Sequence, residues 1–173
     1  MQLESNGYSV FHCNIRSLEK NLNLLNDILI TFKEAPSIIA ISETKLKNNS
    51  ATNISIPGYQ FLSKHSLTSA GGVGIYAKED IQFSRRQDIN LDLEGVETCV
   101  IEISRSKQRN LTFGCIYRHP SSNLEKFQQL LSQKLNFVNQ SGLEACIAGD
   151  VNINFFNTNL TKQLQNILTC FSR

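Results

Sequence analysis

The sequence lacks any long hydrophobic run. Its longest purely apolar stretches are a few residues, such as residues 38–41, whereas a membrane-spanning helix needs about 20 apolar residues in succession. The first seven residues contain neither the basic segment nor the apolar segment of a secretion signal. We therefore predict a protein that does not cross a membrane and that resides in an intracellular, reducing compartment, in the nucleus if it acts on DNA.

A large charge surplus is also missing. The chain has 17 Lys and Arg against 15 Asp and Glu, and a net charge of +2 is too small to attract nucleic acid by itself. Any binding of a polyanion must come from a local patch. With 40% hydrophobic and 18% charged residues over 173 positions, the chain has enough apolar side chains for one globular domain with a sizeable core.

The cysteines lack the spacing of a metal site. No two of them form a Cys-x-x-Cys pair, and their number is odd. Four lie in apolar runs that are typical of strands, so the pattern favours buried thiols over zinc ligands or disulfides. The set comprises Cys13, Cys99, Cys115, Cys146 and Cys170.

The start of the chain alternates between two apolar patterns. Residues 8–15 are rich in β-forming side chains, and residues 38–42 are a continuous apolar run typical of a strand buried on both faces. Between them, apolar residues spaced by three and four predict a helix capped by Ser17 and ended by Pro36: Leu18, Leu22, Leu25, Leu29 and Phe32. This part is therefore predicted as strand, helix, strand.

The rest of the chain changes first to short β-like runs and then back to helices. Five runs, broken by Pro57-Gly58, Gly71-Gly72 and polar loops, predict an antiparallel meander: residues 59–65, 73–78, 81–85, 97–104 and 110–117. A second helix is predicted over residues 124–138 with Ser122 or Asn123 as its cap, then a strand over 145–148. Residues 160–171 predict a short amphipathic helix, which completes an α/β protein.

Polar residues stand at the ends of the predicted strands, where α/β sheets place their sites. They are Asn14, Glu43, Tyr117 with Arg118, and Asp150 with Asn152. Each alone is explained equally well as a turn residue or a solvated strand end. Together they suit a hard cation such as Mg²⁺, which takes few protein oxygens and assists phosphodiester cleavage. We expect Glu43 and Asp150 to end neighbouring strands of one sheet.

The motifs of competing chemistries are missing. The chain has no Gly-rich phosphate loop with Lys-Ser/Thr, no Gly-x-Ser-x-Gly and no His-Glu-x-x-His. The Gly-Gly-Val-Gly run at residues 71–74 does not match a dinucleotide-binding fingerprint, and we predict that it makes a tight strand connection.

Five segments in order resemble the endonuclease/exonuclease/phosphatase superfamily, and within it the apurinic-like endonuclease domain of non-LTR (LINE-type) retrotransposons. They are residues 11–18 (FHCNIRSL), 41–46 (ISETKL), 71–76 (GGVGIY), 116–120 (IYRHP) and 148–152 (AGDVN). The resemblance implies a layered α/β sandwich of two β-sheets flanked by helices. It also implies a DNA endonuclease that uses Mg²⁺ or Mn²⁺, with a reverse-transcriptase domain expected in the full-length element but not contained in these 173 residues.

The resemblance implies a role for each strand-end residue. Glu43 would be the direct metal ligand, and Asn14 would hydrogen-bond either a water on the metal or the neighbouring aspartate. Asp150 would orient and activate the attacking water, and Asn152 would fix that water and a phosphate oxygen. Tyr117 would hydrogen-bond the scissile phosphate.

Two further features carry an implied role and an ordinary alternative. Glu97 would support the metal site without contacting the metal itself. The alternative is that it is a strand residue that faces solvent. Arg16 and Arg118, with other basic residues in predicted loops, would contact DNA phosphates if they share a face with Asn14 and Glu43. The alternative is a scattered, solvated set: Arg16, Lys45, Lys47, Lys64, Arg85, Arg86 and Arg118.

The sequence departs from the family after Asp150. Relatives continue through strands that supply another aspartate and a Ser-Asp-His motif, but here no Asp follows Asp150 and the three histidines, His12, His65 and His119, precede it. We expect residues 1–173 to form one domain that is incomplete at its C-terminal side, lacks the last strands and has impaired activity. The alternatives are a non-catalytic remnant or nucleic-acid-binding module of the same fold, and a phosphatase acting on a small phosphoester.

Overall fold

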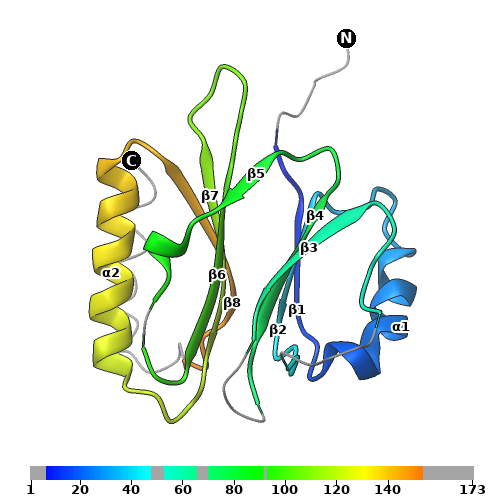
Figure 1. The fold of residues 1–173 in the computed structure, drawn as a ribbon, viewed down its shortest axis with the longest axis horizontal. Helices are drawn as coiled ribbons and strands as arrows, with labels where there is room; N and C mark the ends of the chain where they lie inside the picture. Colours follow the sequence, from blue (N-terminus) through cyan, green and yellow to red (C-terminus); the bar gives the residue numbers. More distant parts are fainter. Residues whose placement is uncertain (1–6, 48–52, 66–69, 92, 154–173) are drawn as a thin grey trace.

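The computed structural model describes residues 7–47, 53–65, 70–91 and 93–153. In these residues, two four-stranded sheets face each other, and one α-helix covers the outer side of each sheet (Figure 1). The predicted layered α/β sandwich is therefore confirmed. The predicted helix over residues 160–171 lies outside the described residues.

The first sheet has the order β1-β2-β4-β3. Its strands are β1 (Val10–Asn14), β2 (Ile38–Ser42), β4 (Val73–Lys78) and β3 (Tyr59–Lys64). The second sheet has the order β5-β6-β7-β8. Its strands are β5 (Phe83–Arg85), β6 (Val96–Ile103), β7 (Leu111–Arg118) and β8 (Glu144–Asp150). A 3₁₀ turn, η1 (Gln87–Ile89), lies between β5 and β6.

The opening strand, helix and strand form as predicted. Strands β1 and β2 pair in parallel, and all five residues of β2 are buried because both of its faces are covered. Helix α1 (Leu18–Leu29) packs four of its leucines, Leu18, Leu22, Leu25 and Leu29, against the first sheet, but Ser17 makes no side-chain capping bond. The helix ends earlier than predicted, because the Thr31 hydroxyl bonds the carbonyl of Ile28 and Phe32 leaves the helix to pack edge-on against Phe11.

The predicted antiparallel meander is divided between the two sheets. Strands β3 and β4 pair antiparallel in the first sheet, whereas β5, β6 and β7 pair antiparallel in the second. The chain crosses from one sheet to the other between Lys78 and Phe83, so β5 begins two residues later than the sequence pattern indicates. Local periodicity predicts strands well, but it does not say which sheet each strand joins.

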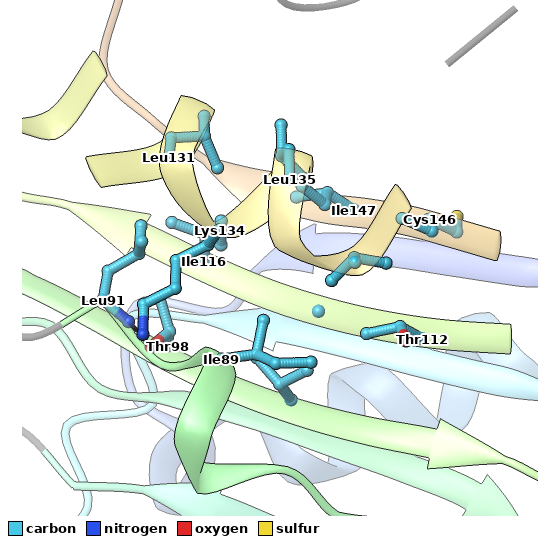
Figure 2. Close-up of a pocket in the computed structure, with 14 residues that line it drawn as sticks. Ile89, Leu91, Thr98, Thr112, Ile116, Leu131, Lys134, Leu135, Cys146 and Ile147 are labelled. Carbon is cyan, nitrogen blue, oxygen red and sulfur yellow. Dashed lines mark hydrogen bonds between the residues drawn. The ribbon is translucent and has the colours of Figure 1, made fainter. Parts of the chain in front are cut away.

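Helix α2 (Leu124–Gln140) covers the second sheet, and Asn123 caps it by accepting a hydrogen bond from the Lys126 amide. A cavity of about 30 Å³ remains between this helix, η1 and the sheet (Figure 2). Apolar side chains dominate its lining. The Thr98 hydroxyl accepts from the Leu91 amide and the Lys134 ammonium donates to the Asp88 carbonyl, whereas the buried Thr112 hydroxyl has no hydrogen-bond partner among the described residues. A space of this size holds about one water molecule.

The main core lies between the two sheets and includes Ile38, Ile75, Ile101 and Phe113. The prediction of buried thiols holds for Cys99 and Cys115, which are fully buried, while Cys13 and Cys146 are half-buried. All four are free cysteines, and burial raises the pKa of Cys13 and of Cys99 to about 11. Cys170 lies outside the described residues. No helix in the part that the structure describes is long and apolar enough to cross a membrane.

Candidate active site

One amide joins two carboxylates at the end of the sandwich. Asn14 is the last residue of β1, and its Nδ2 donates to Glu43 Oε1 at 2.7 Å and to Asp150 Oδ2 at 3.0 Å. Glu43 follows β2 directly, and Asp150 ends β8. Two negative charges, contributed by segments more than a hundred residues apart, are thus held within reach of one another by a single side chain.

The predicted sheet relation of the two carboxylates is wrong. Strand β2, which precedes Glu43, belongs to the first sheet, and β8, which ends in Asp150, belongs to the second. The two residues meet across the sandwich because Asn14, on the edge strand of the first sheet, reaches the end of the opposite sheet. Packing of the two layers, rather than strand pairing, creates the site.

The loop that presents Glu43 is held by two glycines. Glu43 and Lys45 have positive φ values of 53°, an uncommon conformation for such side chains. The amides of Thr44 and Lys45 donate to the carbonyls of Gly72 and Gly71 at 3.1 and 2.9 Å. The Gly-Gly run, predicted to make a tight strand connection, directly precedes β4 and anchors the Glu43 loop.

Glu97 lies on the inner side of the second sheet rather than in solvent. It stands opposite Tyr117 in the register of β6 and β7, and Tyr117 in turn stands opposite Asp150. A Cβ atom placed on Gly71, whose φ is +97°, would come within 2.9 Å of the Glu97 carboxylate. Only glycine therefore lets the backbone at residue 71, which anchors the Glu43 loop, approach Glu97 this closely.

Tyr117 is surrounded by carboxylates. The residue is 4% exposed, and its pKa is raised first by burial and then by the negative charges of Glu43, Asp150 and Glu97. The phenol therefore remains protonated at neutral pH and can act as a hydrogen-bond donor. A donor among acidic groups suits a phosphate oxygen that would otherwise be repelled.

The loop after β8 is tied to itself and to Arg118. Asp150 Oδ1 accepts from the Asn152 amide at 3.0 Å, and Asn152, with a positive φ of 49°, donates through Nδ2 to the Arg118 carbonyl at 2.8 Å. The Arg118 guanidinium donates back to the carbonyls of Val151 and Asn152, both at 2.7 Å, and to the Ser122 carbonyl at 2.9 Å.

The prediction that Arg118 contacts DNA phosphates is therefore corrected. Arg118 is 3% exposed, and its guanidinium carbon lies 5.9 Å from the centre of the Phe127 ring. The guanidinium N–H groups donate hydrogen bonds to backbone carbonyls. Its role is to hold the loop that carries Asp150 and Asn152. Sequence reasoning placed it in a surface loop because it ends an apolar strand, whereas the structure folds the next loop over it.

The other basic residues are spread over different places. Arg16 is exposed, and its amide donates to Asn14 Oδ1 at 3.2 Å, so it lies beside the site. Lys45 is exposed on the Glu43 loop. Arg86, in contrast, is paired with Asp88 and Glu102. Contact of Arg16 with DNA remains a prediction.

We expect Arg118→Lys to lower the free energy of unfolding by about 1–3 kcal/mol, because one ammonium group cannot span the carbonyls of Val151, Asn152 and Ser122 and leaves buried acceptors unpaired. Urea denaturation followed by circular dichroism measures the change. The matched control is Arg85→Lys, since Arg85 is exposed and makes a single 3.3 Å bond to the Ser63 carbonyl. Equal unfolding midpoints for the two variants would contradict this role of Arg118.

The structure adds one residue to the site that sequence reasoning did not include. His12 lines a hollow of about 560 Å³ together with Asn14, Asp150 and Asn152. It stands two residues before Asn14 in the same strand, and the period of two in a strand is the signal that could have placed it there. His119 is not among the lining residues of this hollow, and its Nδ1 lies 2.7 Å from the Ser121 hydroxyl.

The donor set fits a hard divalent cation. The two carboxylates are oxygen ligands of the kind Mg²⁺ prefers, and Mg²⁺ commonly takes only one or two protein carboxylates and keeps several waters. The Asn14 amide turns its nitrogen, not its oxygen, toward them. Within residues 7–47, 53–65, 70–91 and 93–153, no group of three or more His, Cys, Asp or Glu side chains converges as a metal cluster.

A family model described as "Endonuclease/Exonuclease/phosphatase family" matches residues 11–166, and the chain belongs to this family. The resemblance inferred from the five motifs is thereby confirmed. No curated protein sequence matches the chain.

Solved structures show the same fold at low sequence identity. The endonuclease domain of TRAS1, a telomere-specific non-LTR retrotransposon, is 14% identical with a TM-score of 0.62, covering 92% of this chain and 72% of that domain. The 3′ phosphatase NExo from Neisseria, bound to a product DNA hairpin, is 16% identical with a TM-score of 0.58, covering 94% and 71%. The AP endonuclease LMAP from Leishmania major is 17% identical with a TM-score of 0.63, covering 84% and 55%.

Proposed function

We propose that this chain is a Mg²⁺-dependent DNA endonuclease domain of the non-LTR retrotransposon type, which hydrolyses a phosphodiester bond. The observation that carries the proposal is the Asn14 amide, which joins Glu43 and Asp150 at the open end of the sandwich. The family match, the order of the five motifs and the likeness to the TRAS1 endonuclease domain support it. In a full-length element, a reverse-transcriptase domain would accompany this one.

Glu43 is the residue that we expect to hold the cation, with Asp150 beside it. When bound there, Mg²⁺ would draw charge from the phosphoryl oxygens and stabilise the leaving alkoxide. Mn²⁺ offers similar coordination to oxygen ligands. Glu97 would support the site without contacting the cation, because its carboxylate lies beside Tyr117 and against Gly71, which anchors the loop that presents Glu43.

The remaining residues position the water and the phosphate. Asp150 orients the attacking water and takes its proton, while Asn14 keeps the Asp150 carboxylate in place. Asn152 has one amide hydrogen left after its bond to the Arg118 carbonyl, which suits the water or a phosphate oxygen. The Tyr117 hydroxyl donates a hydrogen bond to the scissile phosphate, and Arg16 contacts a flanking phosphate.

The second candidate function is a non-catalytic DNA-binding module, favoured by the exposed Arg16 and Lys45 at the same end of the molecule.

Glu43→Gln tests the proposal through metal binding and DNA cleavage together. We expect the affinity for Mg²⁺ and Mn²⁺, measured by calorimetric titration, to fall at least about tenfold, because the amide keeps the shape of the side chain and removes its charge. Nicking of supercoiled plasmid should fall with it. Glu79→Gln is the matched control, since Glu79 is exposed at the opposite end of β4.

Three results separate the candidates. Equal metal affinity of the wild type and Glu43→Gln would show that Glu43 is not a ligand. Binding of DNA and metal without any nicking would favour the non-catalytic module. Removal of a 3′ phosphate without cleavage of the DNA backbone would favour a phosphatase, the activity named for NExo.

A further inference from the structure

The hollow beside Asp150 has few side chains that can donate a hydrogen bond. It lies between the end of β1 and the residues that follow β8, and its lining comprises His12, Asn14, Gly149, Asp150, Val151, Asn152 and Ile153. This lining contains one carboxylate and no Lys or Arg. Within this lining, the side-chain donors available to an anionic phosphodiester are the N–H groups of His12, Asn14 and Asn152, besides any cation.

Two of these three donors are largely committed. Asn14 has two amide hydrogens, and they are used by Glu43 at 2.7 Å and by Asp150 at 3.0 Å. Asn152 uses one of its two amide hydrogens on the Arg118 carbonyl at 2.8 Å. Among the side chains that line the hollow, the imidazole of His12 is thus the main hydrogen-bond donor that is not already used.

Ser42 determines which nitrogen of His12 is available. The ring Nε2 lies 3.3 Å from the Ser42 hydroxyl, which is fully buried and bonds no other group in the part of the chain that the structure describes. A buried hydroxyl without another acceptor donates its proton, so Nε2 accepts and the neutral ring carries its proton on Nδ1.

We propose that His12 is a further catalytic residue, which donates a hydrogen bond from Nδ1 to a phosphate oxygen of the substrate bound beside Asp150. Ser42 is the positioning residue that sets its tautomer. The inference rests on the proposed function, because it assigns a contact within the same site. The imidazole of the site would then come from β1, and His12 would precede the other residues of the site in the sequence.

The first arm of the test is kinetic, with a short DNA duplex and Mg²⁺. We expect His12→Phe to lower kcat/KM by about 10- to 100-fold, the effect of losing a hydrogen bond to a charged group. His12→Asn places an amide N–H near the position of Nδ1, and we expect it to stay within about fivefold of the wild type. The matched control is His119→Gln, which should stay within about twofold because the His119 ring bonds only Ser121 and its neighbouring backbone.

The second arm reads the contact directly and does not depend on turnover. In the ¹⁵N spectrum of the histidine rings, saturating thymidylyl-thymidine should shift the Nδ1 resonance of His12 and leave that of His119 in place. Ser42→Ala should change the tautomer pattern of His12 in the same spectrum, which a purely space-filling role of Ser42 would not do.

The two experiments distinguish a failure of the His12 inference from a failure of the proposed function. If the wild type cleaves DNA and His12→Phe, shown to be folded by its thermal transition, cleaves it equally well, the inference fails and the proposed function stands. If the wild type does not cleave, the proposed function fails, and the ring spectrum alone decides whether His12 contacts the phosphate. If His12→Phe does not fold, two other results can overturn the inference. One is a fall in the activity of His12→Asn to the level of Glu43→Gln. The other is a His12 Nδ1 resonance that does not shift when the dinucleotide is added.

Discussion

Asp150→Asn is expected to lower the rate of Mg²⁺-dependent DNA cleavage by about 10²- to 10⁴-fold. The carboxylate accepts two hydrogen bonds, from Asn14 Nδ2 at 3.0 Å and from the Asn152 amide at 3.0 Å. The amide of the variant has only one oxygen, so its NH₂ group must face one of these donors or turn away, and it cannot accept a proton from water. Single-turnover nicking of supercoiled plasmid measures the effect without interference from product release.

The matched control for this prediction is Asp80→Asn. Asp80 is an exposed aspartate in the crossing between β4 and β5 and does not line the hollow beside Asp150. We expect Asp80→Asn to cleave DNA at the wild-type rate. Both variants should unfold near the wild-type temperature. Nicking by Asp150→Asn at the wild-type rate would show that Asp150 does not activate the water.

Gly149→Ala is expected to destabilise the fold by about 2–6 kcal/mol, the sum of an unfavourable backbone conformation and overpacking. Gly149 has a φ of +150° and stands opposite Ile116 in the register of β7 and β8. A Cβ atom there would overlap the Ile116 carbonyl oxygen and lie 2.8 Å from its backbone nitrogen. Because these are backbone atoms, no side-chain rotation relieves the overlap. A loss of this size is comparable to the stability of many domains.

Gly114→Ala is the control within the same sheet. Its Cβ would meet Val100 Cγ2 at 3.8 Å, an ordinary van der Waals distance, and Gly114 lies in the interior of β7. We expect its unfolding free energy to change by no more than about 1 kcal/mol. Urea denaturation of both variants is the measurement, and equal midpoints would show that the strand end at Gly149 can move away from β7.

The sequence by itself determined the elements of the fold. The leucines spaced by three and four predicted α1, the unbroken apolar run predicted the fully buried β2, and Asn123 was one of two predicted caps of α2. These signals are local, because a helix face or a buried strand leaves its period in neighbouring residues. The strand-end positions of Asn14, Glu43 and Asp150 followed from the same reasoning.

Only the tertiary structure decided how these elements and side chains meet. It divided the predicted meander between two sheets, brought Glu43 and Asp150 together across the sandwich, buried Arg118 under the loop after β8 and placed His12 beside Asp150. The contacts themselves leave no periodic signal, because each joins residues that are about 30 or more positions apart and belongs to the packing of layers. Only the position of His12 on the same face of β1 as Asn14 follows from the period of two in a strand. The sequence therefore determined which residues end the strands, and the packing of the two sheets determined which of them share a site.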